Sequence, residues 1–145
     1  MSVRSKIPTV ARVLLGLAFF VFGLNFFLHF IPQPAPPPEA GAFLGALVAG
    51  KILTVVKLIE ITTGFLLITG RFVPLSLTLL APIEVGILLF HGVFEPAGLP
   101  LPIILVGLTA YLAYAYRAAF APLLQASAQP SPAGESVAAR PITVP

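Results

Sequence analysis

The sequence predicts an all-α fold, a four-helix transmembrane bundle, from three observations. Of its 145 residues, 58% are hydrophobic and only 9% are charged, whereas a soluble domain has about 25% charged residues. Four apolar stretches approach the roughly 20 residues that a helix needs to cross a bilayer. None of them alternates polar and apolar residues over about 9–11 positions, as the strands of a membrane barrel do. A soluble enzyme, a nucleic-acid binder and a disordered chain are therefore excluded.

The first predicted helix covers residues 10–31, and no charge occurs between Val13 and Pro38. Basic residues precede this stretch, so a cleaved signal peptide is the alternative interpretation. The apolar run is longer than the roughly 7–15 residues of a signal-peptide core, and no Ala-x-Ala site ends it. We therefore expect a retained helix. Its Gly16 and Gly23 form a strip of small residues at which another helix can approach closely.

A proline-rich connection and a short apolar segment come next. Residues 32–38 are rich in proline and cannot be helical, so we expect an extended connection. Residues 41–50 are apolar but too few to cross a bilayer, which predicts an interfacial or re-entrant segment. The second spanning helix is expected over residues 52–69, with Lys57 and Glu60 inside it.

Two further helices and a polar tail complete the chain. The tight turn at residues 70–71 makes the second and third helices antiparallel neighbours. The third helix is expected over residues 72–91 and the fourth over residues 99–120. Residues 1–122 thus form the transmembrane domain. Residues 123–145 are mostly Ala, Ser, Pro and Gly without an apolar period, and we expect a disordered tail there.

The positions of the basic residues predict the orientation. They lie at the N-terminal flank of the first helix, in the turn after the second and at the C-terminal side of the fourth: Arg4, Lys6, Arg12, Arg71, Arg117 and Arg140. The opposite side has Lys51 as its basic flank, beside Glu39 and Glu95. This bias in Lys and Arg predicts that both termini lie in the cytoplasm. We expect the plasma (inner) membrane of a bacterium.

Polar side chains inside the apolar stretches form the candidate site. A charge at the centre of a membrane helix costs at least about 2.5 kcal/mol on insertion scales. At 1.5 Å per residue, Glu60 lies about 12 Å below the outer boundary, and Glu84 lies about 18 Å up a slab roughly 30 Å thick. The two carboxylates thus fall at nearly the same depth. We expect one polar cluster in the outer half of the bundle, formed by Lys57, Glu60, Glu84, His91, His29 and Asn25.

Helical periodicity places these residues on faces. Lys57, Glu60 and Gly64 share one side of the second helix, which we expect to face the bundle. Asn25 and His29 are four residues apart and are expected to share a face of the first helix.

Three interpretations of the polar cluster stay open. In the first, Lys57 and Glu60 form an internal ion pair that fixes helix register. In the second, the cluster binds a ligand or serves redox chemistry. In the third, the cluster lies on an ion pathway. A quinone is one ligand that would fit, because Lys57, His91 and a carboxyl could supply hydrogen-bond donors and a proton. A haem held by His29 and His91 is the less favoured alternative, because no other signal in the sequence indicates haem.

The sequence lacks the motifs of the common catalytic sites. It has no cysteine, no His-Glu-x-x-His motif, no glycine-rich phosphate loop and no Ser–His–Asp set. We expect no metal site and no catalysis by this chain alone. Any chemistry would take place inside the bundle or in a partner.

Several strings resemble the DoxX family of small four-helix membrane proteins. They are residues 11–17 and 22–24 in the first helix, Lys57-Leu-Ile-Glu60 with the following Thr-Thr-Gly64, and Ala81-Pro82-Ile83 leading to Phe90-His91. The resemblance covers about residues 7–120. By resemblance, the pattern positions are Arg12, Gly16, Lys57, Glu60, Gly64, Pro82 and His91. The sequence departs from the pattern at Asn25-Phe26, where a basic residue is expected, and at Glu84, where an amide or neutral residue is usual.

The resemblance implies a role in membrane redox chemistry. The family is named after the small subunit of a thiosulfate:quinone oxidoreductase, and it includes members of membrane redox or oxidative-stress complexes. It implies an integral membrane subunit of a redox-linked or respiratory assembly, close to the quinone. The alternatives are a structural subunit that packs on a larger complex through its glycine faces, and a small transporter or proton path. The expected partners are the lipid bilayer and other membrane subunits or further copies of the chain, and not nucleic acid.

Overall fold

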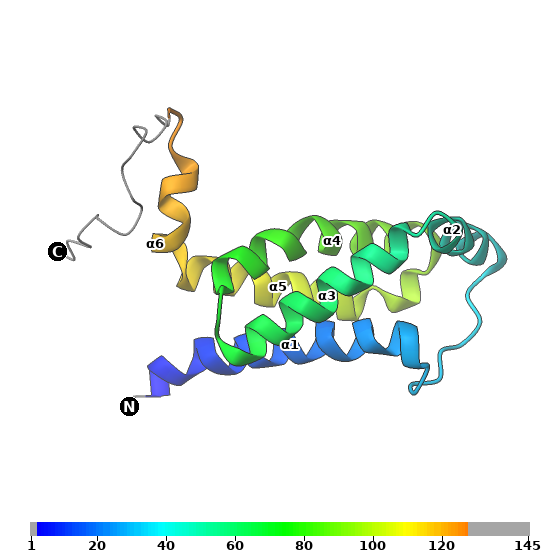
Figure 1. The fold of residues 1–145 in the computed structure, drawn as a ribbon, viewed down its shortest axis with the longest axis horizontal. Helices are drawn as coiled ribbons and strands as arrows, with labels where there is room; N and C mark the ends of the chain where they lie inside the picture. Colours follow the sequence, from blue (N-terminus) through cyan, green and yellow to red (C-terminus); the bar gives the residue numbers. More distant parts are fainter. Residues whose placement is uncertain (1–2, 128–145) are drawn as a thin grey trace.

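The computed structural model describes residues 3–127, and within that range it contains helices and no strand (Figure 1). The all-α prediction is therefore confirmed for this part of the chain. The expected disordered tail falls largely on residues 128–145, which lie outside the described residues. The elements are α1 (Val3–Leu28), α2 (Pro38–Ala49), α3 (Ile52–Thr69), α4 (Val73–Phe94), the 3₁₀ helix η1 (Pro96–Gly98), α5 (Pro100–Ala115), α6 (Arg117–Phe120) and the 3₁₀ helix η2 (Ala121–Leu124).

The long helices have the dimensions of membrane spans. Within the described residues, three are long and apolar enough to cross a bilayer: Lys6–Leu28 of α1, α3 and α4. The pair of α5 with α6 and η2 makes a fourth if it is one span, although it is bent by 80°. Helix α2 has 12 residues and is too short to span. Helices of this length and composition are those of an integral membrane protein.

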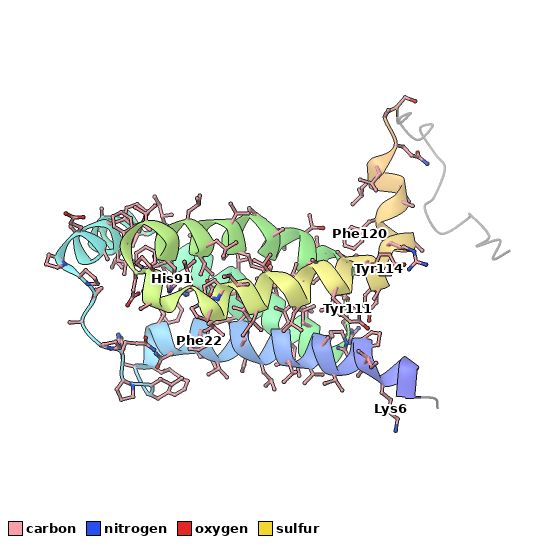
Figure 2. The ribbon with its side chains drawn as sticks, turned by 180° about the vertical axis from the view of Figure 1, so that it is seen from behind. Lys6, Phe22, His91, Tyr111, Tyr114 and Phe120 are labelled. Carbon is pink, nitrogen blue, oxygen red and sulfur yellow. The ribbon has the colours of Figure 1, made fainter. Side chains whose placement is uncertain are left out.

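Helices α1, α3, α4 and α5 lie side by side, and α2 lies across one end of them (Figure 1). The most extensive contact joins α1 to α3. Smaller contacts join α3 to α4, α4 to α5, and α5 to α1. The buried apolar side chains between them include Leu15, Leu67, Leu80 and Leu112. The end covered by α2 is called the α2 end below. Figure 2 shows Lys6 and Phe120 at the other end and His91 near the α2 end.

Glycines bring the backbones of α1 and α3 close together. A Cβ atom added at Gly16 would lie 2.8 Å from the carbonyl oxygen of Gly64, and one at Gly64 would lie 2.6 Å from the backbone nitrogen of Phe20. A Cβ at Gly23 would lie 2.8 Å from a side-chain carbon of Ile61. The strip of small residues therefore forms a contact inside the chain, because only glycine lets the two helices approach this far.

Arg12 ties α1 to the end of α3. Its guanidinium donates hydrogen bonds to the carbonyl oxygens of Leu67 and Ile68, the latter at 3.1 Å. The last carbonyls of a helix have no partner within the helix, so a nearby donor stabilises them. Gly70 ends α3 in the left-handed conformation, with φ of 75°, as glycine commonly does at this position. Arg12 thus does more than flank the membrane, which is all that its position in the sequence predicted.

Helix α1 is displaced from the expected residues 10–31 at both ends. It begins at Val3 and ends at Leu28. The early end has a local cause, because the side chain of Asn25 holds the chain that follows the helix. The backbone N–H of Ile31 donates to Asn25 Oδ1 at 2.6 Å, and Asn25 Nδ2 donates to the carbonyl oxygen of Ile31 at 3.1 Å. Between them His29 has a positive φ of 52°. Asn25 and His29 therefore do not share a helix face.

Two other segments also depart from the expected boundaries. The short apolar segment is a regular helix from Pro38, because proline suits the first helical position and Glu39 suits the first turn. The last expected helix, residues 99–120, breaks after Ala115. Just beyond the break, the Arg117 guanidinium donates to the carbonyl oxygen of Tyr114 at 3.1 Å and lies 4.6 Å from the centre of its ring.

Candidate functional site: a cavity at the α2 end

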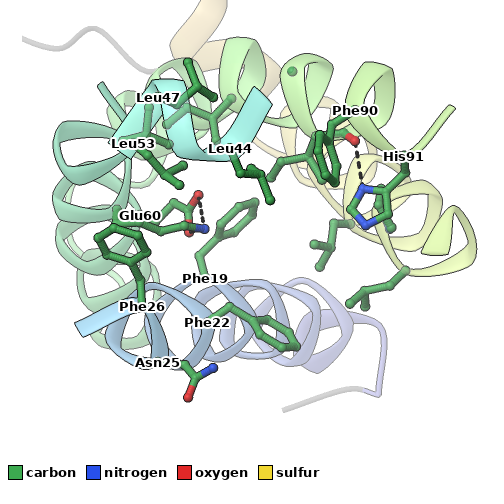
Figure 3. A pocket seen from close by; sticks show the side chains of 18 of the residues that line it. Phe19, Phe22, Asn25, Phe26, Leu44, Leu47, Leu53, Glu60, Phe90 and His91 are labelled. Atoms are coloured by element: carbon green, nitrogen blue, oxygen red, sulfur yellow. Dashed lines mark hydrogen bonds and ion pairs between the residues drawn. The ribbon is translucent and has the colours of Figure 1, made fainter. Parts of the chain in front are cut away.

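A cavity of about 700 Å³ lies near the α2 end, among α1, α2, α3, α4 and the start of α5 (Figure 3). Its walls are mainly aromatic and aliphatic, with Phe19, Phe22, Phe26, Phe43 and Phe90 supplying the rings. The polar lining residues are Asn25, Gln33, Lys57, Glu60, His91 and Glu95. A space of this size, apolar with a few polar groups, is typical of sites for small organic ligands.

Lys57 and Glu60 form an ion pair on the wall that α3 provides. Lys57 Nζ lies 2.8 Å from Glu60 Oε2 and 3.0 Å from Oε1. The Glu60 side chain is only 2% exposed, whereas that of Lys57 is 19% exposed. An ammonium group has three N–H donors, and the carboxylate accepts two of them. The two opposite charges cancel, and by this count Lys57, which lines the cavity, keeps one further N–H.

His91 lies on the opposite wall, on α4. Figure 3 shows Glu60 and His91 on opposite sides of the cavity, with Phe19 and Phe22 on the α1 side between them. His91 Nδ1 lies 2.9 Å from the carbonyl oxygen of Ile87. A carbonyl oxygen only accepts, so Nδ1 carries a hydrogen. Nε2 is left to accept a hydrogen bond or, in the protonated ring, to donate one.

Two neighbours hold the His91 ring in place. A Cβ atom added at Gly98 would lie 2.3 Å from His91 Cδ2, so the backbone of η1 packs directly against the imidazole. Glu95 Oε2 lies 3.9 Å from Nε2, at the edge of ion-pair distance. The Nε2 edge of the ring therefore lies beside the backbone of Gly98 and the carboxylate of Glu95.

Asn25 lines the cavity, but its amide is already engaged. Both of its polar atoms are hydrogen-bonded to the backbone of Ile31. The connection that follows contributes Gln33, Pro34 and Pro36 to the lining. Asn25 therefore positions one wall of the cavity, and each of its two polar atoms has one hydrogen-bonding position left.

Glu84 belongs to a different contact from the Lys57–Glu60 pair. It is buried, and its Oε1 accepts a hydrogen bond of 2.6 Å from Thr109 Oγ1 on α5. Its side chain does not line the cavity, although Pro82 and Gly86, two residues away on either side, do. Two residues correspond to about 200° around a helix, which places Glu84 on the opposite face of α4. The single expected cluster is thus divided. Glu60 and Glu84 were expected at the same depth in the membrane, but their side chains point in different directions.

His29 also lies outside the cavity. It is exposed beyond the end of α1, and of the two histidines only His91 lines the cavity. Within residues 3–127, no group of three or more His, Asp or Glu side chains is placed to hold a metal ion.

Helix α2 supplies a wall that the sequence reasoning missed. Its Phe43, Leu44 and Leu47 line the cavity. The Phe43 ring stacks on Phe90 and on Phe94, with centroids 6.2 Å and 5.4 Å apart. The available signal was the grouping of these three large residues among Ala and Gly, at a spacing that puts them on one face of a helix.

Comparison with family models, with curated proteins and with solved structures finds no match to this chain. The resemblance to the DoxX family is therefore supported by its sequence strings alone and stays a prediction.

Proposed function

We propose that the chain is a four-helix transmembrane bundle, with both termini in the cytoplasm, whose cavity binds a quinone. The observation that carries the proposal is the arrangement of Lys57 and His91 on opposite walls of a cavity lined otherwise by aromatic and aliphatic side chains. The asymmetry of Lys and Arg supports the orientation. In this orientation the cavity lies in the outer half of the membrane.

The chemistry of a quinone fits these two polar residues. A para-quinone has two carbonyl oxygens on opposite sides of one flat ring, and its reduced form has two hydroxyl groups there. The third N–H of Lys57 can donate to one of these oxygens. His91 Nε2 can accept from a hydroxyl when neutral and donate to a carbonyl when protonated. The apolar walls suit the ring and the first part of its isoprenoid chain.

The proposed setting is a redox-linked or respiratory assembly in the plasma membrane of a bacterium. Since the chain has no cysteine, it offers no thiolate for an iron–sulfur cluster or a thiol relay. We place the electron-transferring groups in partner subunits, as the resemblance to the DoxX family implies. In this assembly the chain binds the quinone and does not catalyse a reaction by itself.

The alternative structural role would need a surface other than the three glycines on which the sequence based it. That role required the glycine faces to be available to a larger complex. Gly16, Gly23 and Gly64 instead lie in the contact between α1 and α3 inside the chain.

The test is equilibrium binding of decylubiquinone to the purified protein in detergent micelles. The wild type is expected to bind saturably, and the double variant Lys57→Met with Glu60→Leu is expected to lose binding. Glu84→Gln is the matched control, because it changes a buried carboxyl that does not line the cavity, and it should bind like the wild type. Partitioning into micelles without saturation by the wild type would contradict the proposal.

A further inference from the structure

Gly86 lies within α4, where neither the packing nor the backbone requires a glycine. Glycine is the least favourable residue in a helix interior apart from proline. A Cβ atom added at Gly86 meets nothing within 4 Å, in contrast to the tight contacts of Gly16 and Gly64. Gly70 has a positive φ, which favours glycine, but Gly86 does not. The helix itself therefore gives no reason for this residue.

The cavity does give a reason, because Gly86 lines it between two side chains that carry rings. Pro82 precedes Gly86 by four residues and Phe90 follows it by four, and all three line the cavity. Residues four apart lie on one face of a helix, about 6 Å apart along its axis. Pro82, Gly86 and Phe90 thus form a notch, in which bare backbone lies between two rings.

The aromatic wall of this notch is held in place by its neighbours. The Phe90 ring stacks against Phe43 of α2 at 6.2 Å and lies 5.7 Å from Phe94. A flat ring is the chemical group that fits between two ring side chains and can pack on an aromatic face. We infer that the Gly86 notch receives the head ring of the quinone, and that residue 86 sets the ring size the cavity accepts. This inference rests on the proposed function, since it places that ligand within the cavity.

A pair of matched substitutions tests the notch. Gly86→Leu fills it, whereas Gly107→Leu adds the same side chain at a position on α5 that is equally open and does not line the cavity. Decylubiquinone should bind the Gly86→Leu protein about tenfold or more weakly, and should bind the Gly107→Leu protein like the wild type. Equal binding to all three proteins would overturn the notch and leave the proposed function standing. Binding to none of them would overturn the proposed function and this placement together.

A second measurement locates the ring even if Gly86→Leu does not fold. The chain has no cysteine, so Gly86→Cys and Gly107→Cys each carry a single thiol. Saturating decylubiquinone, whose ring carbons are all substituted, should slow alkylation of the thiol at position 86 by N-ethylmaleimide about tenfold. It should not slow alkylation at position 107. Protection at both positions or at neither would overturn the placement of the ring at Gly86.

Discussion

Lys57 and Glu60 form an ion pair in which the lysine side chain is more exposed than the glutamate side chain. Lys57 Nζ lies 2.8 Å from Glu60 Oε2, and the side chains are 19% and 2% exposed, respectively. The two residues are three positions apart on α3, so they meet on one face of the helix. The lysine compensates the buried carboxylate and also lines the cavity. The pair is therefore placed both to compensate a buried charge and to contact a ligand in the cavity.

Removing the lysine alone should destabilise the protein. Lys57→Met leaves Glu60 buried without its cation, and loss of one partner of a buried pair costs about 3–5 kcal/mol. The free energy of unfolding should fall accordingly, as measured from the SDS unfolding curve of the purified protein. A wild-type unfolding curve for Lys57→Met would contradict the pairing.

Replacing both members separates the two roles. The double variant Lys57→Met with Glu60→Leu should recover most of the lost stability, because no charge is left uncompensated. It should nevertheless fail to bind decylubiquinone. A stable double variant that binds like the wild type would show that the pair serves structure alone.

The close contact of α1 with α3 predicts a large effect of a single methyl group. Gly64→Ala would place a Cβ 2.6 Å from the backbone nitrogen of Phe20, so the two helices must move apart. Such overpacking costs about 1–3 kcal/mol of stability. The control is Gly107→Ala, which meets no atom within 4 Å and should keep or raise stability, because alanine favours helix. Equal SDS unfolding curves for the two variants would contradict the contact.

The bond between Thr109 and Glu84 should contribute to stability and not to ligand binding. Thr109→Val leaves the buried carboxyl of Glu84 without the 2.6 Å hydrogen bond, which costs about 1–3 kcal/mol. Thr62→Val is the control, because Thr62 is exposed and bonds only within its own helix; the change there should stay within about 0.5 kcal/mol. Decylubiquinone binding should be unchanged in both. Weaker binding in Thr109→Val would place Glu84 in the binding site after all.

The orientation predicts the location of reporter domains fused to the chain. Fusions after Arg71 and after Arg117 should show cytoplasmic activity, and a fusion at Glu95 should show external activity, because Lys and Arg favour the cytoplasmic side. The reversed pattern would place the cavity in the cytoplasmic half of the membrane.

The sequence predicted the long helices better than the shape of the site. The apolar stretch at residues 52–69 coincides with α3, because apolar length and a terminal glycine are both local signals. The end of α1 was displaced because it depends on the side chain of Asn25, which bonds to a residue six positions later. The break after Ala115 likewise falls inside residues 99–120, which hydropathy assigned to one helix, so hydropathy alone did not reveal it.

The site was predicted in part. The depth of a residue in the membrane follows from counting residues along a helix, but the direction of its side chain in the bundle does not. Lys57, Glu60, His91 and Asn25 line one cavity. Glu84 faces Thr109, whose position 25 residues further along the chain gives no local signal. The wall from α2 depends on how a short helix folds back across the others, and hydropathy does not specify that arrangement.

The most direct measurement is the amount of quinone that the protein retains from a membrane. Wild type and the double variant Lys57→Met with Glu60→Leu are purified in a mild detergent from the same quinone-containing bacterial membranes, and extracted quinones are quantified by mass spectrometry against the protein. Quinone is expected in stoichiometric proportion to the wild-type chain and is expected to be lost from the double variant. Equal, substoichiometric quinone in the two preparations would contradict the claim that this cavity is a quinone site.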